Sequence, residues 1–242
     1  MKGWLAEVVE SRLGEKHSPE QIAGRLSVKG LGDVSHETIY RYVRADKKAG
    51  GCLYRNLRIN GKRRYRRRAK AQRHKIPGRV GIEDRPASVE NLTRYGDWEV
   101  DLIEGSKGSG FVLSLYERKT MTTKLWKLGT KGAEETAAGI IGALAGVRAR
   151  TLTYDNGAEF SRHQEVSEAL GAKGYFCHPY SSWEKGGVEN LNGLVRQYLP
   201  KGSSFADLTQ ERLTEIEQEL NKRPRKSMNF TAPIEHKHKL TA

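Results

Sequence analysis

Cysteines and long hydrophobic runs are scarce in these 242 residues, and each absence excludes some classes of protein. The two cysteines, Cys52 and Cys177, stand 125 positions apart, which excludes a disulfide framework or a cysteine-rich zinc site and predicts a reducing compartment. The longest apolar run, residues 137–147, is shorter than the roughly 20 residues that cross a bilayer. The start of the chain lacks the pattern of a signal peptide. We therefore expect a soluble cytoplasmic protein.

Acidic residues are scarce in the front third of the chain. Residues 1–80 contain 21 Lys and Arg against 7 Asp and Glu, whereas residues 81–242 contain 22 of each. The whole net charge of +14 therefore arises in the front third. Positive charge clustered in this way is typical of a protein that binds nucleic acid, whereas a merely soluble basic protein would spread its charge.

The densest basic block contains no acid at all. Residues 62–75 carry nine positive charges in fourteen positions, and such a block cannot pack in a core. It is a solvated linker, an arm that lies along a phosphate backbone, or both, because disordered basic arms often order when they bind. The candidate phosphate contacts in it are Arg63, Arg64, Arg66, Arg67 and Arg68.

Residues 1–60 have the pattern of a small helical module. Ser18 fits a capping box that starts one helix, and Ser35 starts a second. Two short helices joined by a turn resemble a helix-turn-helix, although an ordinary helical hairpin is an equal alternative because the connection is longer than usual. In a helix-turn-helix, the second helix presents side chains able to contact bases or phosphates: His36, Thr38, Tyr40 and Arg41.

From residue 82 onward, short β-like runs alternate with helical stripes. The expected strands are 97–103, 110–117, 123–128, 150–154 and 174–177. The expected helices are 133–147, 163–170, 188–199 and 208–220. This order predicts an α/β domain with a mixed five-stranded sheet that starts as a meander. We expect this larger domain at 91–242, with a basic C-terminal tail, after a basic linker at 61–90 and the helical module at 1–60.

Two aspartates end or interrupt predicted strands. Asp101 lies in a strand rich in Trp, Val, Leu and Ile, where a carboxylate is costly to desolvate unless it is paired or bound to a metal. Asp155 closes another strand just before Asn156 and Gly157. Asp-Asn-Gly is also a common turn sequence, so this second aspartate has an ordinary structural explanation as well.

A third acid, Glu189, opens a predicted helix. Arg196 lies on the same face two turns along, as it also would on an ordinary solvated helix surface. Glu184 is a rival acid, but it precedes two glycines and is expected in a loop. A fold that brought Asp101, Asp155 and Glu189 together would offer oxygen ligands to two divalent metal ions. Such a pair of ions clamps the attacking and leaving oxygens of a phosphodiester.

Three stretches of sequence resemble the motif blocks of a known enzyme class. Residues 95–103, 153–160 and 179–190 are similar to those of a DDE transposase, and they most resemble the IS-thirty (insertion sequence thirty) family of bacterial transposases. Further similar stretches at 36–42, 76–80, 198–202 and 221–226 extend the resemblance almost end to end. Members of this family carry an additional N-terminal helix-turn-helix, so we expect the present chain to be shortened at its front.

The resemblance implies a ribonuclease-H-like catalytic core, shared with retroviral integrases, in which Asp101, Asp155 and Glu189 hold two Mg²⁺ or Mn²⁺ ions. It also implies nicking of double-stranded DNA at the inverted repeats of the element and strand transfer into target DNA. A homo-oligomer assembled on DNA in the bacterial nucleoid would perform these steps. Two alternatives stay open: a shortened, non-catalytic DNA-binding regulator, and a general nuclease of the same fold.

The resemblance implies DNA contacts close to the three acids. Arg196 would hold a phosphate near the metal ions, and Lys201 lies in one of the similar stretches and is a further expected contact. Tyr180 and Trp183 precede the helix that carries the glutamate. They would either stack on a splayed terminal base or pack in the core.

Overall fold

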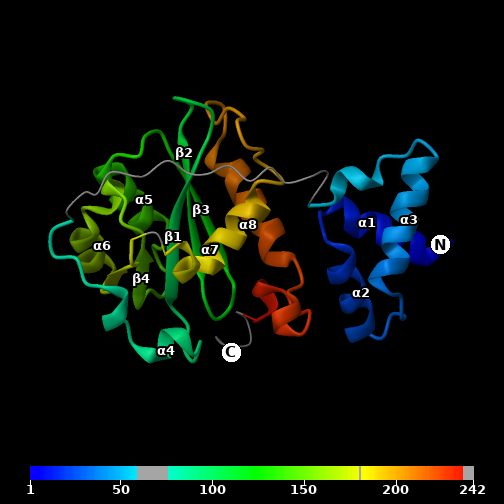
Figure 1. The fold of residues 1–242 in the computed structure, drawn as a ribbon, viewed down its shortest axis with the longest axis horizontal. Coiled ribbons are helices and arrows are strands. Elements are labelled where there is room, and N and C mark those ends of the chain that lie inside the picture. Colours follow the sequence, from blue (N-terminus) through cyan, green and yellow to red (C-terminus); the bar gives the residue numbers. More distant parts are fainter. Residues whose placement is uncertain (59–75, 180, 237–242) are drawn as a thin grey trace. The chain divides into compact units, whose positions relative to one another are not determined.

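The computed structural model describes residues 1–58, 76–179 and 181–236, and these separate into two compact units (Figure 1). The described residues of 1–69 and 221–242 form one unit, and those of 70–220 form the other. Several predicted DNA contacts lie outside the described residues: Arg63, Arg64, Arg66, Arg67, Arg68 and Tyr180. In the part of the chain that the structure describes, no helix is long and apolar enough to cross a membrane.

The first unit contains the predicted short helices. They are α1 (Trp4–Gly14), α2 (Pro19–Val28), α3 (His36–Lys48) and the short 3₁₀ helix η1 (Leu53–Asn56). The capping box at Ser18 is confirmed, because its Oγ accepts the N–H of Gln21 at 3.2 Å and the Gln21 side chain accepts the N–H of Ser18 at 2.9 Å. Ser35 caps α3 by accepting the N–H of Thr38 at 3.1 Å. The helices bury a shared core of Val9, Leu13, Ile22, Leu26, Ile39 and Val43.

The segment around Phe230 packs on α2 within the same unit. A Cβ placed on Gly24 would lie 2.3 Å from ring atoms of Phe230, so glycine is what lets this ring lie against the helix. Arg25 donates to the carbonyl of Phe230 at 3.1 Å and forms an ion pair with Glu235. The segment includes the 3₁₀ helix η5 (Lys226–Met228) and joins the C-terminal residues to helices some 200 positions earlier in the sequence.

The second unit is built on the predicted sheet. Its strands are β1 (Asp97–Glu104), β2 (Phe111–Glu117), β3 (Thr123–Leu128), β4 (Thr151–Tyr154) and β5 (Lys173–Phe176). The strand order is β3-β2-β1-β4-β5, with β1, β2 and β3 antiparallel and with β4 and β5 parallel to β1. This is the mixed five-stranded sheet that the sequence predicts, and every strand begins and ends within one residue of its prediction.

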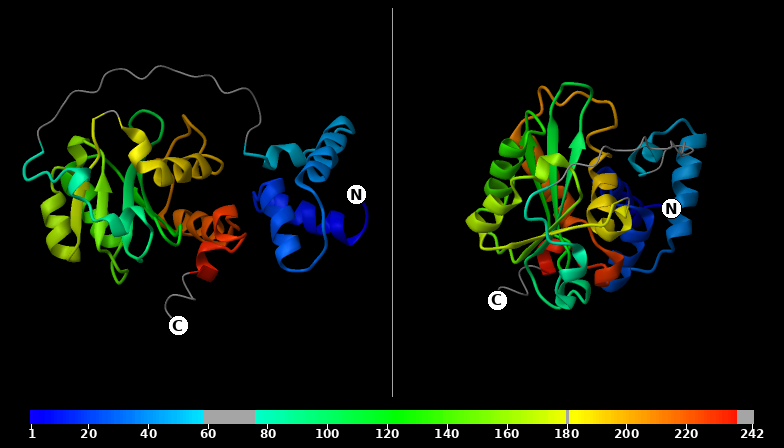
Figure 2. Two further views of the ribbon diagram at one scale, coloured as in Figure 1. Left: turned by 60° about the horizontal axis from the view of Figure 1, so that its bottom comes forward. Right: turned by 60° about the vertical axis from the view of Figure 1, so that its left-hand side comes forward.

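Helices cover both faces of the sheet (Figure 1, Figure 2). On one face lie α5 (Ala133–Ala143) and α6 (His163–Leu170), and on the other lie α7 (Gly186–Val195) and α8 (Gln210–Lys222). Shorter elements complete the unit: η2 (Ile82–Asp84), α4 (Ala87–Glu90), η3 (Ala158–Phe160) and η4 (Ser182–Lys185). The β3 edge is closed by α8, because Glu217 accepts the N–H of Leu125 at 3.1 Å and Gln210 accepts that of Lys127 at 2.9 Å.

Strand β1 divides its side chains between the two faces. Trp98 and Val100 belong to the core beneath α5, whereas Ile103 belongs to the core beneath α7. Because successive side chains of a strand point to opposite faces, Glu99 and Asp101 lie on the α7 face with Ile103. Glu99 and Asp101 therefore face the helix that carries Glu189.

Two predicted helices are shorter than expected. The helix expected at 133–147 ends at Ala143, and the one expected at 188–199 ends at Val195. After Ala143 the backbone hydrogen bonds join residues three apart instead of four. Gly146 then adopts a φ of 68°, which lies outside the range of a right-handed α-helix and ends it. After Val195 the same tightening occurs, with the N–H of Tyr198 bonded to the carbonyl of Val195 at 2.9 Å.

Candidate active site

The parallel pairing of β1 and β4 brings Asp101 and Asp155 side by side. In this pair Glu99 lies opposite Thr153, and two further residues along each strand lead to the two aspartates. Asp155 directly follows the C-terminal end of β4, where open α/β sheets bind their ligands, and Asp101 lies beside it on β1. The proximity predicted for these two residues follows from the strand register alone.

Lys185 lies between the two aspartates. Its Nζ is 3.1 Å from Oδ2 of Asp155 and 3.5 Å from Oδ1 of Asp101, and it donates to the carbonyl of Val100 at 2.9 Å. The lysine side chain is only 5% exposed, whereas those of Asp101 and Asp155 are 25% and 43% exposed. Burial alone would lower the pKa of the ammonium, but the charges of Asp101 and Asp155 outweigh burial and raise that pKa. The pair thus forms a cation-binding position, and Lys185 supplies its cation.

A separate hydrogen bond fixes the second oxygen of each aspartate. Asn192 of α7 donates to Oδ2 of Asp101 at 2.6 Å, and Ser114 of β2 donates to Oδ1 of Asn192 at 2.7 Å. The N–H of Gly157 donates to Oδ1 of Asp155 at 2.9 Å. Each carboxylate is therefore held in one orientation with its remaining oxygen toward Lys185.

The structure does not bring Glu189 into a common metal-binding set with the two aspartates. Glu189 is exposed in the first turn of α7, three residues before Asn192 and hence on the same side of the helix. Among the described residues, no three His, Cys, Asp and Glu side chains are placed to hold a metal ion. Asp101 and Asp155 are thus the acids that the structure brings together, and the role of Glu189 stays a proposal.

A further acid, Glu159, lies near the aspartate pair. It is half-buried in η3 and its carboxyl folds back toward Gly157. Burial raises the pKa of Glu159, and the charges of Asp155 and Asp101 raise it further. Glu159 is not among the predicted site residues, although its position four residues after Asp155, in the loop that follows β4, is a signal for it.

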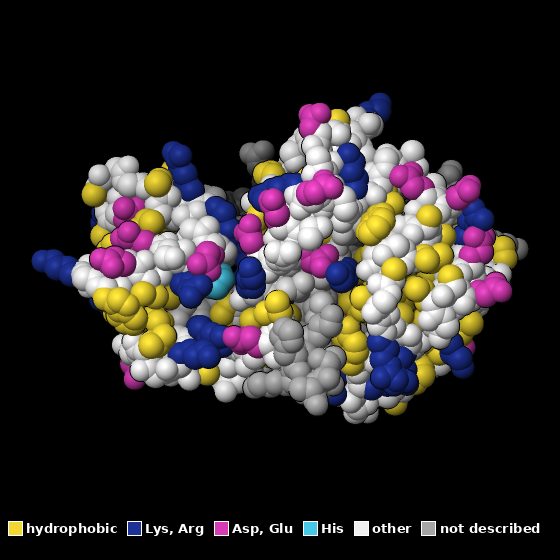
Figure 3. Space-filling model, turned by 180° about the vertical axis from the view of Figure 1, so that it is seen from behind, with side chains coloured by type: hydrophobic (Ala, Val, Ile, Leu, Met, Phe, Trp, Pro, Cys, Tyr) yellow, Lys and Arg dark blue, Asp and Glu magenta, His cyan; other side chains and the backbone are white. Residues whose placement is uncertain are grey.

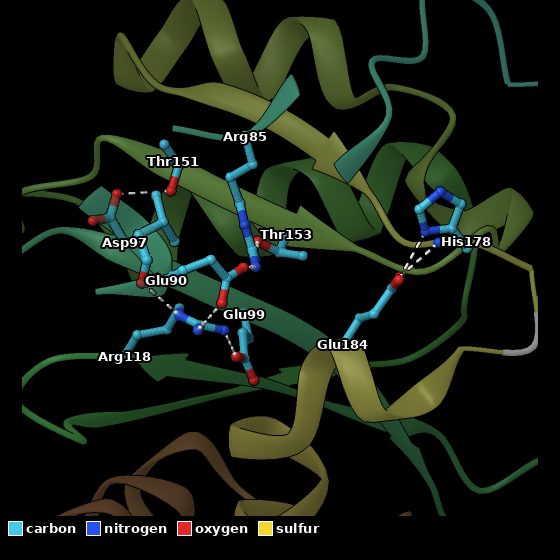
Figure 4. A network of polar contacts seen from close by, with 10 residues as sticks. Arg85, Glu90, Asp97, Glu99, Arg118, Thr151, Thr153, His178 and Glu184 are labelled. Atoms are coloured by element: carbon cyan, nitrogen blue, oxygen red, sulfur yellow. Dashed lines mark hydrogen bonds and ion pairs between the residues drawn. The ribbon is translucent and has the colours of Figure 1, made fainter. Parts of the chain in front are cut away.

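The rival acid Glu184 has a partner of its own. It lies in η4 and accepts hydrogen bonds from the N–H and from the Nδ1 of His178, both at 2.7 Å (Figure 4). The hydrogen bond to Glu184 raises the pKa of His178. Glu184 is therefore bound away from the position that Lys185 shares with Asp101 and Asp155.

A row of polar contacts lies along β1 and β4. Figure 4 shows these contacts, in which Arg118 lies between Glu90 and Glu99. Thr151 donates to Asp97 at 2.8 Å, and Arg85 donates to Thr153 at 2.8 Å. Unlike the aspartate pair, this row is made of oppositely charged or hydrogen-bonded partners, so it stabilises the neighbouring backbone.

The predicted DNA contacts near the acids occupy different environments. Arg196 is partly buried: it donates to the carbonyl of Glu104 at 2.8 Å and lies over the ring of Phe205, and burial lowers its pKa. Lys201 is exposed in the turn after α7. Trp183 is 73% exposed, so the core-packing alternative is wrong for this side chain.

The predicted contacts on α3 form two neighbouring side-chain pairs. His36 and Arg41 are exposed, and Thr38 and Tyr40 are partly exposed. The rings of His36 and Tyr40 meet edge to face at 6.4 Å, and Arg41 reaches the Thr38 hydroxyl at 3.5 Å.

Basic and acidic side chains are interspersed on the molecular face drawn in Figure 3.

Comparison with known proteins identifies relatives over nearly the whole chain. The transposase for insertion sequence element IS4351 of Bacteroides fragilis is 46% identical over 221 residues, which is 90% of this chain and 68% of the relative. The transposase for IS1086 of Cupriavidus metallidurans is 40% identical, over 96% of this chain and 72% of the relative. Transposase InsI for IS30C of Escherichia coli is 34% identical, over 96% of this chain and 63% of the relative.

The chain therefore belongs to the IS30 family of insertion-sequence transposases. It spans about two thirds of the length of these relatives. No family model matches the chain. Among solved structures, the catalytic core domain of BIV integrase matches with 19% identity and a TM-score of 0.46. The match covers 60% of this chain and 97% of that domain.

Proposed function

We propose that this chain cuts DNA at the ends of an insertion sequence and joins the freed ends to target DNA, with Asp101 and Asp155 at the reacting phosphate. One observation carries the proposal: two carboxylates from adjacent parallel strands converge on a single cation position, where Lys185 lies at 3.1 and 3.5 Å. Glu189, on the helix facing these strands, is the proposed third acid of a DDE site.

The donor set suits a hard divalent cation. Oδ1 of Asp101 and Oδ2 of Asp155 face the shared position, while Asn192 and the N–H of Gly157 hold the other two oxygens. Mg²⁺ and Mn²⁺ take oxygen ligands, and hydrogen bonds to the ligands' outer atoms orient them. When bound, two such ions would polarise the phosphodiester and activate the attacking hydroxyl.

The remaining residues would hold DNA at this site. Without a metal ion, the Lys185 ammonium would neutralise the negative charge of Asp101 and Asp155. Once a divalent ion occupies the position between them, Lys185 would contact a phosphate of the DNA. The exposed ring of Trp183 in η4 offers a surface on which a terminal base can stack. Lys201 would contact the phosphate backbone of the DNA. The exposed side chains of α3 would contact the sequences at the ends of the element, and a homo-oligomer would bring two DNA ends together.

The test is cleavage and strand transfer on duplexes that carry the inverted repeats flanking the gene. We expect the unaltered chain to cut and join these ends in Mg²⁺ or Mn²⁺. Asp155→Asn should lower the rate by a factor of about 10³ or more, because a ligand to the ions is lost. Asp207→Asn, which changes an exposed aspartate after α7, is the matched control and should keep the full rate.

Three results would contradict the proposal. Full activity of Asp155→Asn would refute the assignment of this carboxylate. Equal cutting of unrelated DNA would indicate a general nuclease. Salt-sensitive binding of the ends without turnover, even with pre-cut ends in Mn²⁺, would indicate a non-catalytic regulator.

A further inference from the structure

Glu99 is a buried acid to which the proposed reaction gives no role. It lies on β1, two residues before Asp101 and on the same face of the sheet, and its side chain is only 2% exposed. Its Oε1 accepts a hydrogen bond from Nη1 of Arg118 at 2.5 Å, and its Oε2 accepts the N–H of Val188 at 2.8 Å. A buried carboxylate is unfavourable unless it is paired and hydrogen-bonded, and these two contacts satisfy both conditions.

The N–H of Val188 belongs to the first turn of α7. The first four N–H groups of a helix lack partners within the helix, and a nearby negative charge stabilises that end. Within the described chain, the N-cap residue of α7, Lys185, makes no capping hydrogen bond with its side chain. Glu99 therefore supplies from a strand the acceptor that the N-cap residue does not provide.

The start of α7 also lies unusually close to the strands. A Cβ on Gly187 would lie 2.9 Å from Oε2 of Glu99 and 2.3 Å from the ring of Tyr116. Tyr116 of β2 is the residue paired with Glu99 across the sheet. The absence of a side chain at Gly187 lets the helix approach near enough for the Val188 hydrogen bond to form.

We infer that Glu99 is a positioning residue that fixes the first turn of α7 on β1 and thereby sets where Glu189 stands relative to Asp101. Glu189 directly follows the bonded Val188, and one turn further Asn192 donates to Asp101 at 2.6 Å. Two anchors on one strand thus define both the position and the rotation of the helix. This inference rests on the proposed function, because it assumes that Glu189 acts at the metal site.

Mn²⁺ binding to the full chain, measured by the electron paramagnetic resonance of free Mn²⁺, tests the inference without DNA. Glu99→Leu removes the acceptor for Val188, and Glu99→Gln keeps an oxygen there, while both remove the charge that faces Arg118. We expect Glu99→Leu to bind Mn²⁺ about 10-fold more weakly and Glu99→Gln to stay within about 3-fold of the unaltered chain. Glu90→Gln is the matched control, because Glu90 pairs with the same arginine at 3.1 Å but is 58% exposed.

The same substitution in a Glu189→Gln variant separates a role in positioning Glu189 from a merely structural role of Glu99. If Glu99 acts through Glu189, then Glu99→Leu added to Glu189→Gln should weaken Mn²⁺ binding by less than 2-fold beyond the single Glu189 change. Equal fold-losses in both backgrounds would overturn the inference, as would equal losses for Glu99→Leu and Glu99→Gln.

Two further results complete the test. If Glu99→Leu shows no cooperative thermal unfolding, Glu99→Asp is measured instead. The shorter aspartate keeps the charge but places its oxygens farther from the N–H of Val188. It should weaken Mn²⁺ binding about 3-fold, and unchanged binding would overturn the inference. Failure of the unaltered chain to bind Mn²⁺ would refute the proposed metal site and this inference together. Binding that Asp155→Asn abolishes and the Glu99 variants leave unchanged would refute only the role of Glu99.

Discussion

Replacing Lys185 by Met tests whether the aspartate pair is a cation-binding position. Met keeps most of the buried aliphatic stem and removes the ammonium between Asp101 and Asp155. We expect the metal-free protein to lose stability and a divalent cation to restore more of it than in the unaltered chain, because the cation then meets two unpaired carboxylates.

The size of the loss follows from the contacts of the ammonium. At 3.1 and 3.5 Å, an effective dielectric constant of about 20 gives an attraction of roughly 5 kcal/mol for each contact. Removing Lys185 also removes a desolvation cost of several kcal/mol, and the two aspartates, 25% and 43% exposed, regain contact with water. We therefore expect a net loss of about 2 kcal/mol, or about 4 to 8 °C in melting temperature.

Thermal unfolding with and without 10 mM Mg²⁺ measures both effects. The Mg²⁺-induced rise in melting temperature should be larger for Lys185→Met than for the unaltered chain. Lys173→Met, which changes an exposed lysine at the start of β5, is the control and should melt like the unaltered chain in both conditions.

Two outcomes would refute this reasoning. If Lys185→Met melts at the same temperature as the unaltered chain, the ammonium is not a stabilising partner of the aspartates. If Mg²⁺ raises both melting temperatures equally, the divalent ion and the ammonium do not share one position.

Three further predictions concern the first unit. Burial lowers the pKa of His17 from 6.5 to about 4, so the unfolded chain binds more protons between these values and stability falls as the pH drops from 6.5 to 4, by about 3 kcal/mol. Urea unfolding against pH should show this slope, and His17→Gln should remove it. Phe230→Ala should cost about 1 to 2 kcal/mol, less than the roughly 3 to 5 kcal/mol of a fully buried phenylalanine, because Phe230 is only partly buried. It should also speed hydrogen exchange in α2, whereas unchanged exchange would contradict its packing on Gly24. Arg41→Ala should weaken binding to the element ends and, if Arg41 contacts a phosphate, reduce the salt slope by about 1.

Local patterns were enough to predict the sheet and the two aspartates. The five strands are short β-branched or aromatic runs bounded by turns, and their periodicity depends on neighbouring residues alone. Asp101 stood out because its neighbours are apolar, and Asp155 because it closes a strand. The pairing of these two carboxylates then follows once β1 and β4 are parallel neighbours.

Contacts that join distant parts of the chain were beyond local patterns. Lys185 reaches Asp101 across 84 positions and Asp155 across 30, and no spacing in the sequence indicates such contacts. Phe230 lies on Gly24 for the same reason. Glu99 does have a local signal, because acids at 97, 99 and 101 alternate with apolar residues and so share one face of the strand.

Anomalous scattering from a crystal of the full chain soaked in Mn²⁺ tests most directly whether Asp101 and Asp155 form the metal site. We predict a peak within about 2.0 to 2.2 Å of Oδ1 of Asp101 and Oδ2 of Asp155, with the Lys185 ammonium displaced. A peak bound by other residues, or no peak between these two aspartates at saturating Mn²⁺, would contradict the claim that they form the metal site.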